Sequence, residues 1–183
     1  MGWADPSKVT FAQIKPRRGA ICDIPDLELF PHYFKVNDRV SFRAALELPL
    51  AQLVFSVLAK LRIWGLIKRP WRFARLIVRL GRYFDFMGSA LGGMVVRVQG
   101  KGSDGQAIGA EWHISADDNT GPEIPCMAAI LLAQKLALQT SLPVGAYPCL
   151  GLLRLEDFEP EFARWGMKTT IETQRSSYAP SKI

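Results

Sequence analysis

Apolar and polar residues alternate along two neighbouring stretches in the middle of the chain, residues 94–99 and 108–116. A period of two predicts β-strands, because successive side chains of a strand point to opposite faces. Between the stretches, residues 100–105 read G-K-G-S-D-G and contain the G-x-G-x-x-G spacing of dinucleotide-binding loops. Such a loop must open a helix. Because a strand pattern follows instead, we interpret the segment as a β-hairpin.

The residues of the turn predict the register of this hairpin. Ser103 and Asp104 suit the centre of a type I turn, and Gly105 suits the left-handed residue that follows it. This register brings apolar side chains together in the pairs Val98 with Ala110, Val96 with Trp112, and Met94 with Ile114. On the opposite face it places Arg97 across from Glu111, which is a favourable pair of opposite charges.

Helical patterns occur on both sides of the hairpin. One helix is expected from about Pro49 to 64, with Gly65 as its stop, and a second from about 70 to 86. Further helices are expected over about 125–139 and 156–165. Thr120-x-x-Glu123 resembles a capping box, but Pro125 suits the first turn, so this helix is expected to start slightly after the box implies.

Shorter strands complete the predicted elements, and they are expected over residues 19–22, 39–47, 152–155 and 167–173, with a turn or single helical turn over 23–31. Paired strands beside segregated helices predict an α+β fold. We expect a mostly antiparallel or mixed sheet with helices packed on one face, plus a two-helix insertion. The whole chain of 183 residues is expected to form one domain, with residues 1–18 and 176–183 loose.

The net charge of +6 comes from one local segment. Residues 49–84 contain no acid and eight basic residues, which are Lys60, Arg62, Lys68, Arg69, Arg72, Arg75, Arg79 and Arg82. Four of them form a stripe on the second helix, Arg72, Arg75, Arg79 and Arg82, opposite an apolar stripe of Phe73, Ile77, Leu80 and Phe84. We favour a solvated basic face, and a dimer contact or an anionic membrane surface are the alternatives. Nucleic acid is not expected as a partner, because no recognised binding motif accompanies the charge.

Composition narrows the chemistry and the compartment. Cys22, Cys126 and Cys149 lie far apart without a C-x-x-C, which favours a reducing compartment, and the first residues lack the apolar region of a signal peptide. We therefore expect a cytoplasmic protein. His32 and His113 do not have ligand spacing, so no structural metal is expected. The nucleophile-elbow, zinc-protease and phosphate-loop motifs do not occur in the sequence.

The catalytic residues are not identified by the sequence, but several side chains are candidates for substrate binding: Asp23, Asp26, Glu28, Arg43, His113 and Glu123. The acidic cluster at 23–28 could receive a cationic substrate or cap the adjacent turn, and both interpretations stay open. His113 is expected on the polar face of its strand as an exposed or hydrogen-bonded residue, with an acid–base role as the alternative. Cys126 is expected to be a small buried residue rather than a reactive thiol at a helix start.

Four runs, in the same order, resemble the saccharopine dehydrogenase-like oxidoreductases, and they are CDIPDLELFP (22–31), GGMVVRVQG (92–100), GPEIPC (121–126) and GAYPCLG (145–151). The resemblance extends from about Arg18 to about Ile171. Members of that family combine an N-terminal Rossmann domain, which carries a true G-x-G-x-x-G, with an α+β domain that shapes the substrate site and often the dimer contact.

This chain resembles the second, non-Rossmann part alone. The resemblance implies the substrate-side or dimerisation domain of an NAD(P)-dependent oxidoreductase, whose partners are a second copy or its own Rossmann domain. NAD or NADP is expected only if a Rossmann domain lies upstream, and this chain by itself is not expected to bind the cofactor or to be active. The alternative is a non-catalytic module that serves self-association or attachment to a membrane surface. The substrate is not indicated.

Overall fold

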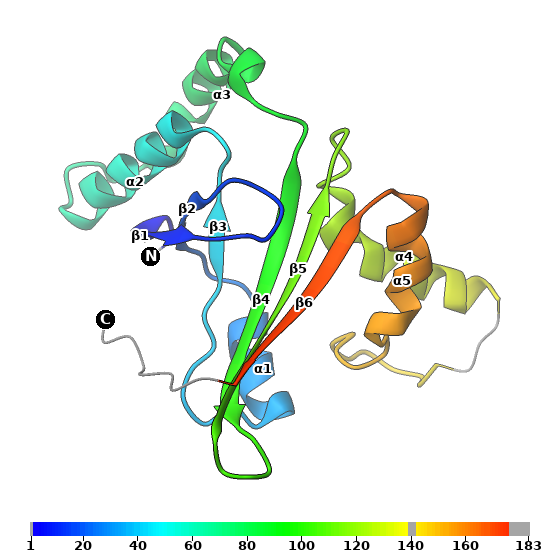
Figure 1. Cartoon of the computed structure of the whole chain (residues 1–183). Coiled ribbons are helices and arrows are strands. Elements are labelled where there is room, and N and C mark those ends of the chain that lie inside the picture. Colours follow the sequence, from blue (N-terminus) through cyan, green and yellow to red (C-terminus); the bar gives the residue numbers. More distant parts are fainter. Residues whose placement is uncertain (1, 139–141, 176–183) are drawn as a thin grey trace. The chain divides into compact units, whose positions relative to one another are not determined.

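The computed structural model describes residues 2–138 and 142–175, and the predicted α+β class is confirmed (Figure 1). The described residues cluster into two compact units. The first unit comprises residues 2–10 and 15–89, and the second comprises 11–14, 90–138 and 142–175. Each unit contains one antiparallel sheet of three strands, so the strands are divided between two small sheets and not gathered into the single sheet we expected.

The sheet of the first unit has the order β1-β2-β3, formed by β1 (Ala4–Val9), β2 (Arg17–Ile21) and β3 (Arg43–Ala45). The expectation that residues 1–18 are loose was wrong for Ala4–Val9, because their backbone groups pair with β2. The ring of Trp3 also stacks on Phe55, with ring centroids 4.9 Å apart. The predicted strand at 39–47 is confirmed only for Arg43–Ala45.

The helices of the first unit are α1 (Asp26–Phe34), α2 (Pro49–Ile63) and α3 (Ala74–Arg82), with 3-10 turns η1 (Pro70–Phe73) and η2 (Asp85–Met87) beside α3. The two-helix insertion is confirmed. Gly65 stops α2 as predicted, at a φ of 76° that favours glycine. The single turn expected at 23–31 was too short, because α1 runs for nine residues and continues past Pro31. The helix predicted at 70–86 is regular only over its middle part.

The sheet of the second unit has the order β4-β5-β6, formed by β4 (Gly92–Lys101), β5 (Ala107–Ala116) and β6 (Lys168–Arg175). The predicted hairpin register is confirmed in every pair, including Met94 with Ile114, Val96 with Trp112, Arg97 with Glu111 and Val98 with Ala110. The backbone N–H of Gly102 donates to the carbonyl oxygen of Gln106 at 2.8 Å. Gly105 has a φ of 77°, as the turn requires.

Two helices, α4 (Glu123–Ala137) and α5 (Leu155–Arg164), belong to the second unit. The first of them starts slightly later than the capping box implies, as predicted, because its first residue is Glu123 and not Gly121, and Pro125 occupies the first turn. It begins two residues before the expected start at about 125. The predicted strand at 152–155 was wrong, since Leu155 begins α5 and the residues just before it form a bend. Residue 139 of the predicted helix and the tail 176–183 lie outside the described residues.

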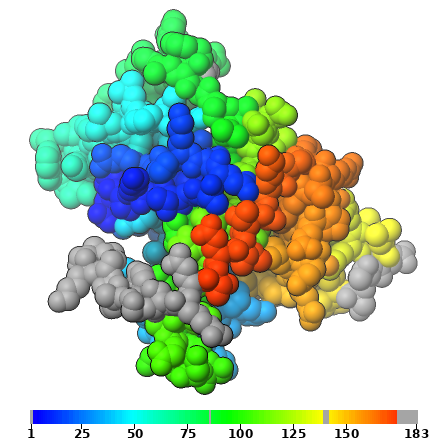
Figure 2. Space-filling model, viewed as in Figure 1, coloured from blue at the N-terminus to red at the C-terminus, as the bar shows by residue number. Residues whose placement is uncertain are grey.

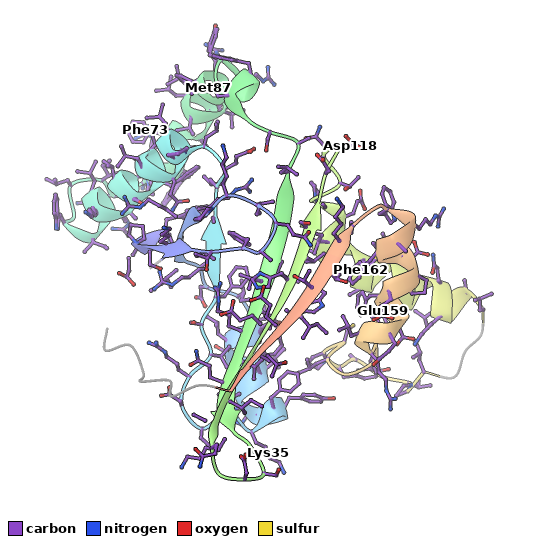
Figure 3. All side chains as sticks on the ribbon, viewed as in Figure 1. Lys35, Phe73, Met87, Asp118, Glu159 and Phe162 are labelled. Atoms are coloured by element: carbon purple, nitrogen blue, oxygen red, sulfur yellow. The ribbon has the colours of Figure 1, made fainter. Side chains whose placement is uncertain are left out.

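The core of the second unit lies between the helices and one face of the sheet. Its buried members are Ile114, Ala116, Met127, Leu131, Phe162 and Met167. Phe162 points from α5 toward this face, and its ring lies 6.1 Å from that of Trp112, centroid to centroid (Figure 3). Removing these side chains from water stabilises the unit by roughly 1.5–3 kcal/mol for each large residue.

Two glycines of the second unit are required by close packing. A Cβ on Gly92 would lie 2.9 Å from the Cα of Gly121, and a Cβ on Gly93 would lie 2.6 Å from the carbonyl oxygen of Ile114. Larger residues would therefore force the backbones apart. Gly92, Gly93 and Gly121 belong to runs that carry the resemblance, so packing accounts for them without any ligand.

Asp157 joins the start of α5 to α4. Its Oδ2 accepts the backbone N–H of Arg154 at 2.8 Å, and its Oδ1 lies 3.3 Å from Nζ of Lys135. The bond from Arg154, together with the charge of Lys135, lowers the pKa of Asp157 below its ordinary value. The lowered pKa means that the folded state favours the ionised carboxylate.

We predict that Asp157→Ala lowers the urea midpoint of unfolding at pH 7 and that the loss shrinks in acid. A depressed folded-state pKa contributes stability above the ordinary pKa of aspartate, and that stability disappears as the pH falls through the folded value. Urea titrations at neutral and acidic pH measure both effects. Glu159→Ala, an exposed change in the same helix, is the control. Equal losses at both pH values would contradict the assignment.

Candidate functional site

A row of charged and polar side chains crosses the face of the second sheet opposite the core. Arg97 on β4 lies opposite Glu111 on β5, and the Nε to Oε2 distance is 2.9 Å. The same Oε2 lies 3.4 Å from Nε2 of His113. On the other side of β5, Glu172 of β6 stands directly opposite Glu111. The predicted Arg97–Glu111 pair is confirmed, and the guanidinium offsets the repulsion between the two carboxylates.

His113 is buried, with 5% of its surface exposed. The backbone N–H of Ala12 donates to Nδ1 at 3.3 Å. Because Nδ1 accepts this hydrogen bond, the ring proton of the neutral form lies on Nε2 and faces Glu111. Of the two states that we expected, exposed or hydrogen-bonded, the structure places His113 in the second.

The short segment 11–14 covers part of this polar face. In addition to the Ala12 contact, Ser115 Oγ donates to Oε1 of Gln13, and a Cβ on Gly93 would lie 3.2 Å from Cδ1 of the buried Ile14. The sequence pattern did not predict this role for the segment, because its partners are about a hundred residues away. The arrangement could hold or pass a proton between Glu111 and His113, but the cover leaves the imidazole little access to a substrate.

The remaining candidates belong to other elements, and all of them except Glu123 lie in the first unit. Asp26 and Glu28 lie in the first turn of α1, where the positive end of the helix dipole favours acids, and Asp23 is exposed just before them. The guanidinium of Arg43 pairs with the carboxylate of Asp5 at 2.9 Å in the first sheet. Glu123 is the first residue of α4. The helix start explains the positions of Asp26 and Glu28, and the ion pair with Asp5 explains that of Arg43, without a bound substrate.

Cys126 differs from our expectation of a small buried residue. It is exposed in the first turn of α4, directly before the fully buried Met127. Met127 is buried in the core, whereas the preceding Cys126 faces outward, because consecutive helical residues point about 100° apart. Cys22 and Cys149 are also free thiols.

The most unusual surface of the described chain belongs to α2. This helix packs on β1 and β2 through its polar and small residues, Gln52, Ser56 and Ala59, which are buried. Gln52 Oε1 accepts the backbone N–H of Leu46 at 3.2 Å. Gln52 Nε2 and Ser56 Oγ are buried without a hydrogen-bond partner among the described residues. The sheet therefore covers the polar stripe of the helix and not its apolar one.

The apolar stripe of α2 faces outward. Leu53 is 58% exposed and Trp64, just after the helix, is 69% exposed. Other large apolar side chains of α2 that remain exposed are Leu50, Val54, Val57 and Ile63. Amphipathic helices on monomeric proteins normally bury such a stripe, because exposed apolar patches promote association.

The following helix, α3, continues this surface. None of the residues of α3 is buried, and the predicted arginine stripe is exposed over η1 and α3. The predicted apolar stripe lies on the other side, where Phe73 and Leu80 are also exposed. Figure 3 shows Phe73 and Met87 projecting outward from this region, and Figure 2 shows residues 49–87 at the surface of the first unit. We call residues 49–87 the helix-pair surface.

Comparison with protein-family models found none that matches this chain, and no curated protein and no solved structure matched it. Among the described residues, no group of three or more histidine, cysteine or acidic side chains could hold a metal ion. In the same part of the chain, every helix is too short or too polar to cross a membrane.

We predict that Arg97→Ala leaves the fold intact and lowers the free energy of unfolding by about 0.2–1 kcal/mol, because the ion pair is partly exposed. Glu111 then faces Glu172 without its counter-charge, which favours the upper part of this range. Urea unfolding measures the change. Gln99→Ala, on the same face of the same strand, is the control. An unfolded variant, or one as stable as the wild type, would contradict this account of the row.

We also predict that the chain by itself does not bind NADH or NADPH. Residues 100–105 close a hairpin, so their backbone N–H groups do not stand at a helix start, where a pyrophosphate would bind. A titration that follows cofactor fluorescence should show no saturable binding at sub-millimolar concentrations. Saturable binding that Gly102→Ala abolishes would show that the turn binds the cofactor after all.

Proposed function

We propose that the chain is an attachment module, which docks through its helix-pair surface onto a second copy of itself or onto a membrane. The observation that carries the proposal is the orientation of α2, which buries Gln52 and Ser56 and exposes Leu53, Val57 and Trp64. Covering these side chains in a docked state removes apolar area from water, at about 25 cal/mol per Å². The hydrophobic effect therefore favours docking.

The orientation of α2 is held by specific contacts within the first unit. The Leu46–Gln52 hydrogen bond and the stacking of Trp3 on Phe55 both fix the inner side of the helix. Rotation that buried Leu53 would break these contacts and would move the side chain of Gln52 into water. The outward apolar stripe is therefore a property of the folded unit.

The oxidoreductase role implied by the resemblance stays a prediction. In that role this chain is the substrate-side domain, and the hydride chemistry belongs to a Rossmann domain and its NAD or NADP. The cytoplasm stays the expected compartment. An attachment module is compatible with this role, because the family's α+β domain often provides the dimer contact.

We predict that the wild-type protein either self-associates at micromolar concentrations or pellets with vesicles of natural polar lipids. The double variant Leu53→Glu with Val57→Glu should do neither, because the added charges oppose docking of the stripe. Light scattering and vesicle pelleting measure the two outcomes. Leu136→Glu is the matched control, since this leucine is 63% exposed on α4, outside the helix-pair surface.

A wild-type monomer that stays in the supernatant, with behaviour unchanged by the double variant, would overturn the attachment proposal. Circular dichroism of each variant shows whether it is folded. A variant that unfolds is replaced by the single change Leu53→Ser, which removes the apolar side chain without adding charge.

A further inference from the structure

We infer that the occupant of the helix-pair surface is an anionic lipid bilayer, on which α2 and α3 lie in the headgroup region. This inference rests on the proposed attachment function and selects the membrane over a second copy of the chain as the docking partner. It is carried by three observations about the same stretch: the sign of its charge, the exposure of its apolar side chains, and the length of α2.

The charges along residues 49–84 of the helix-pair surface all have one sign. Residues 49–84 carry eight basic side chains and no acidic one, while the rest of the chain has a net charge of −2. The arginines of α3 are exposed, so their guanidinium groups are available to ligands. Guanidinium groups bind phosphate oxygens in a bidentate manner, and basic segments are attracted to bilayers that contain anionic lipids.

The same charge opposes a symmetric dimer through this surface. In a twofold contact a patch meets its own copy, so eight cations of one protomer would approach eight of the other. Residues 49–84 contain no acidic residue to pair with them. A bilayer with anionic headgroups instead supplies the opposite charge along the whole surface. Nucleic acid would neutralise the arginines but would leave the leucine and valine side chains in water.

The apolar side chains suit an interface between water and hydrocarbon. Trp64 and Trp71 are exposed at the end of α2 and the start of η1, and tryptophan concentrates at the headgroup level of membranes. Leu53 and Val57 lie on the outward side of α2, where they can enter the acyl boundary. Phe73 and Leu80 provide comparable apolar groups on the side opposite the arginine stripe, as in amphipathic helices that lie on membranes.

The helices are too short for a transmembrane arrangement. With 15 residues, α2 extends about 22 Å at 1.5 Å per residue, which is less than the hydrocarbon thickness of about 30 Å. Its inner side is also held on the first sheet. A helix that is short, basic and apolar on its outer side binds parallel to the membrane surface.

Vesicle pelleting tests the inference directly. Vesicles of phosphatidylcholine alone are compared with vesicles that also contain about 30 mol% phosphatidylserine, each at low and high salt. We expect binding to the anionic vesicles to be at least about tenfold stronger, and to weaken at high salt because salt screens exposed charges. The intrinsic fluorescence of Trp64 and Trp71 should shift to the blue on binding, and Trp64→Phe with Trp71→Phe should remove most of the shift.

Two variants that lose the same number of charges distinguish binding through the helix-pair surface from non-specific attraction by the total charge of the protein. The first changes Arg72, Arg75, Arg79 and Arg82 to glutamine. The control changes four exposed basic residues elsewhere to glutamine, Lys8, Lys15, Lys101 and Arg154. We expect the first variant to lose at least about tenfold in vesicle affinity and the control to lose much less, since exposed charges act only within about a Debye length of the membrane.

Equal binding to neutral and anionic vesicles, or equal losses in the two charge variants, would overturn the inference. A dimer that Leu53→Glu dissociates, combined with no vesicle binding, would overturn it and leave the attachment function standing. A monomer without vesicle binding would overturn both. Circular dichroism of the arginine variant confirms its fold, and Arg75→Gln with Arg79→Gln replaces it if four changes unfold the helix.

Discussion

The hydrogen bond from the backbone N–H of Leu46 to Oε1 of Gln52 sets the orientation of α2 on the first sheet. It ties the end of the β3 region to the inner side of the helix, next to Ser56 and Ala59. Two buried polar atoms nearby lack partners among the described residues, which costs stability. Despite this cost, the polar stripe of α2 lies against the sheet, and the apolar stripe of the helix therefore faces outward.

The composition of the surface follows from that orientation. Where α2 ends, Gly65 turns the chain, and the next segment brings a second helix whose side chains are all at least partly exposed. Basic and apolar groups therefore stand next to one another along residues 49–87. Either kind of group alone has ordinary explanations, a solvated charged face or a protein contact. Their combination over residues 49–84, which contain no acid, is what favours a lipid surface over a copy of the same chain.

The second unit shows the opposite arrangement, in which the sheet separates apolar from polar groups. Its helices cover one face and bury Ile114 and Met127. The other face carries Arg97, Glu111 and His113, with segment 11–14 over the histidine. Because the β4–β5 ladder is continuous over ten pairs, each side chain of this hairpin has its face determined by the register. The polar row is thus a product of the hairpin, and its cover comes from a distant part of the chain.

The sequence was sufficient wherever local chemistry decides the structure. Turn residues and alternation determined the hairpin at 94–116, its register and the Arg97–Glu111 pair, because a one-residue slip would put the apolar side chains on the wrong face. Proline and glycine likewise determined the bounds of α2. The acidic residues near α1 could be read both as caps and as a binding cluster, and the helix start accounts for Asp26 and Glu28.

Tertiary structure decided what depends on contacts between distant residues. The pairing of Ala4–Val9, the cover over His113 and the inward side of α2 each require partners that no local pattern specifies. Helical periodicity showed that α2 is apolar over much of its circumference, but it did not determine which side of the helix packs on the sheet. That choice depended on the donor at Leu46 and the ring of Trp3, which meet the helix only once the chain has folded.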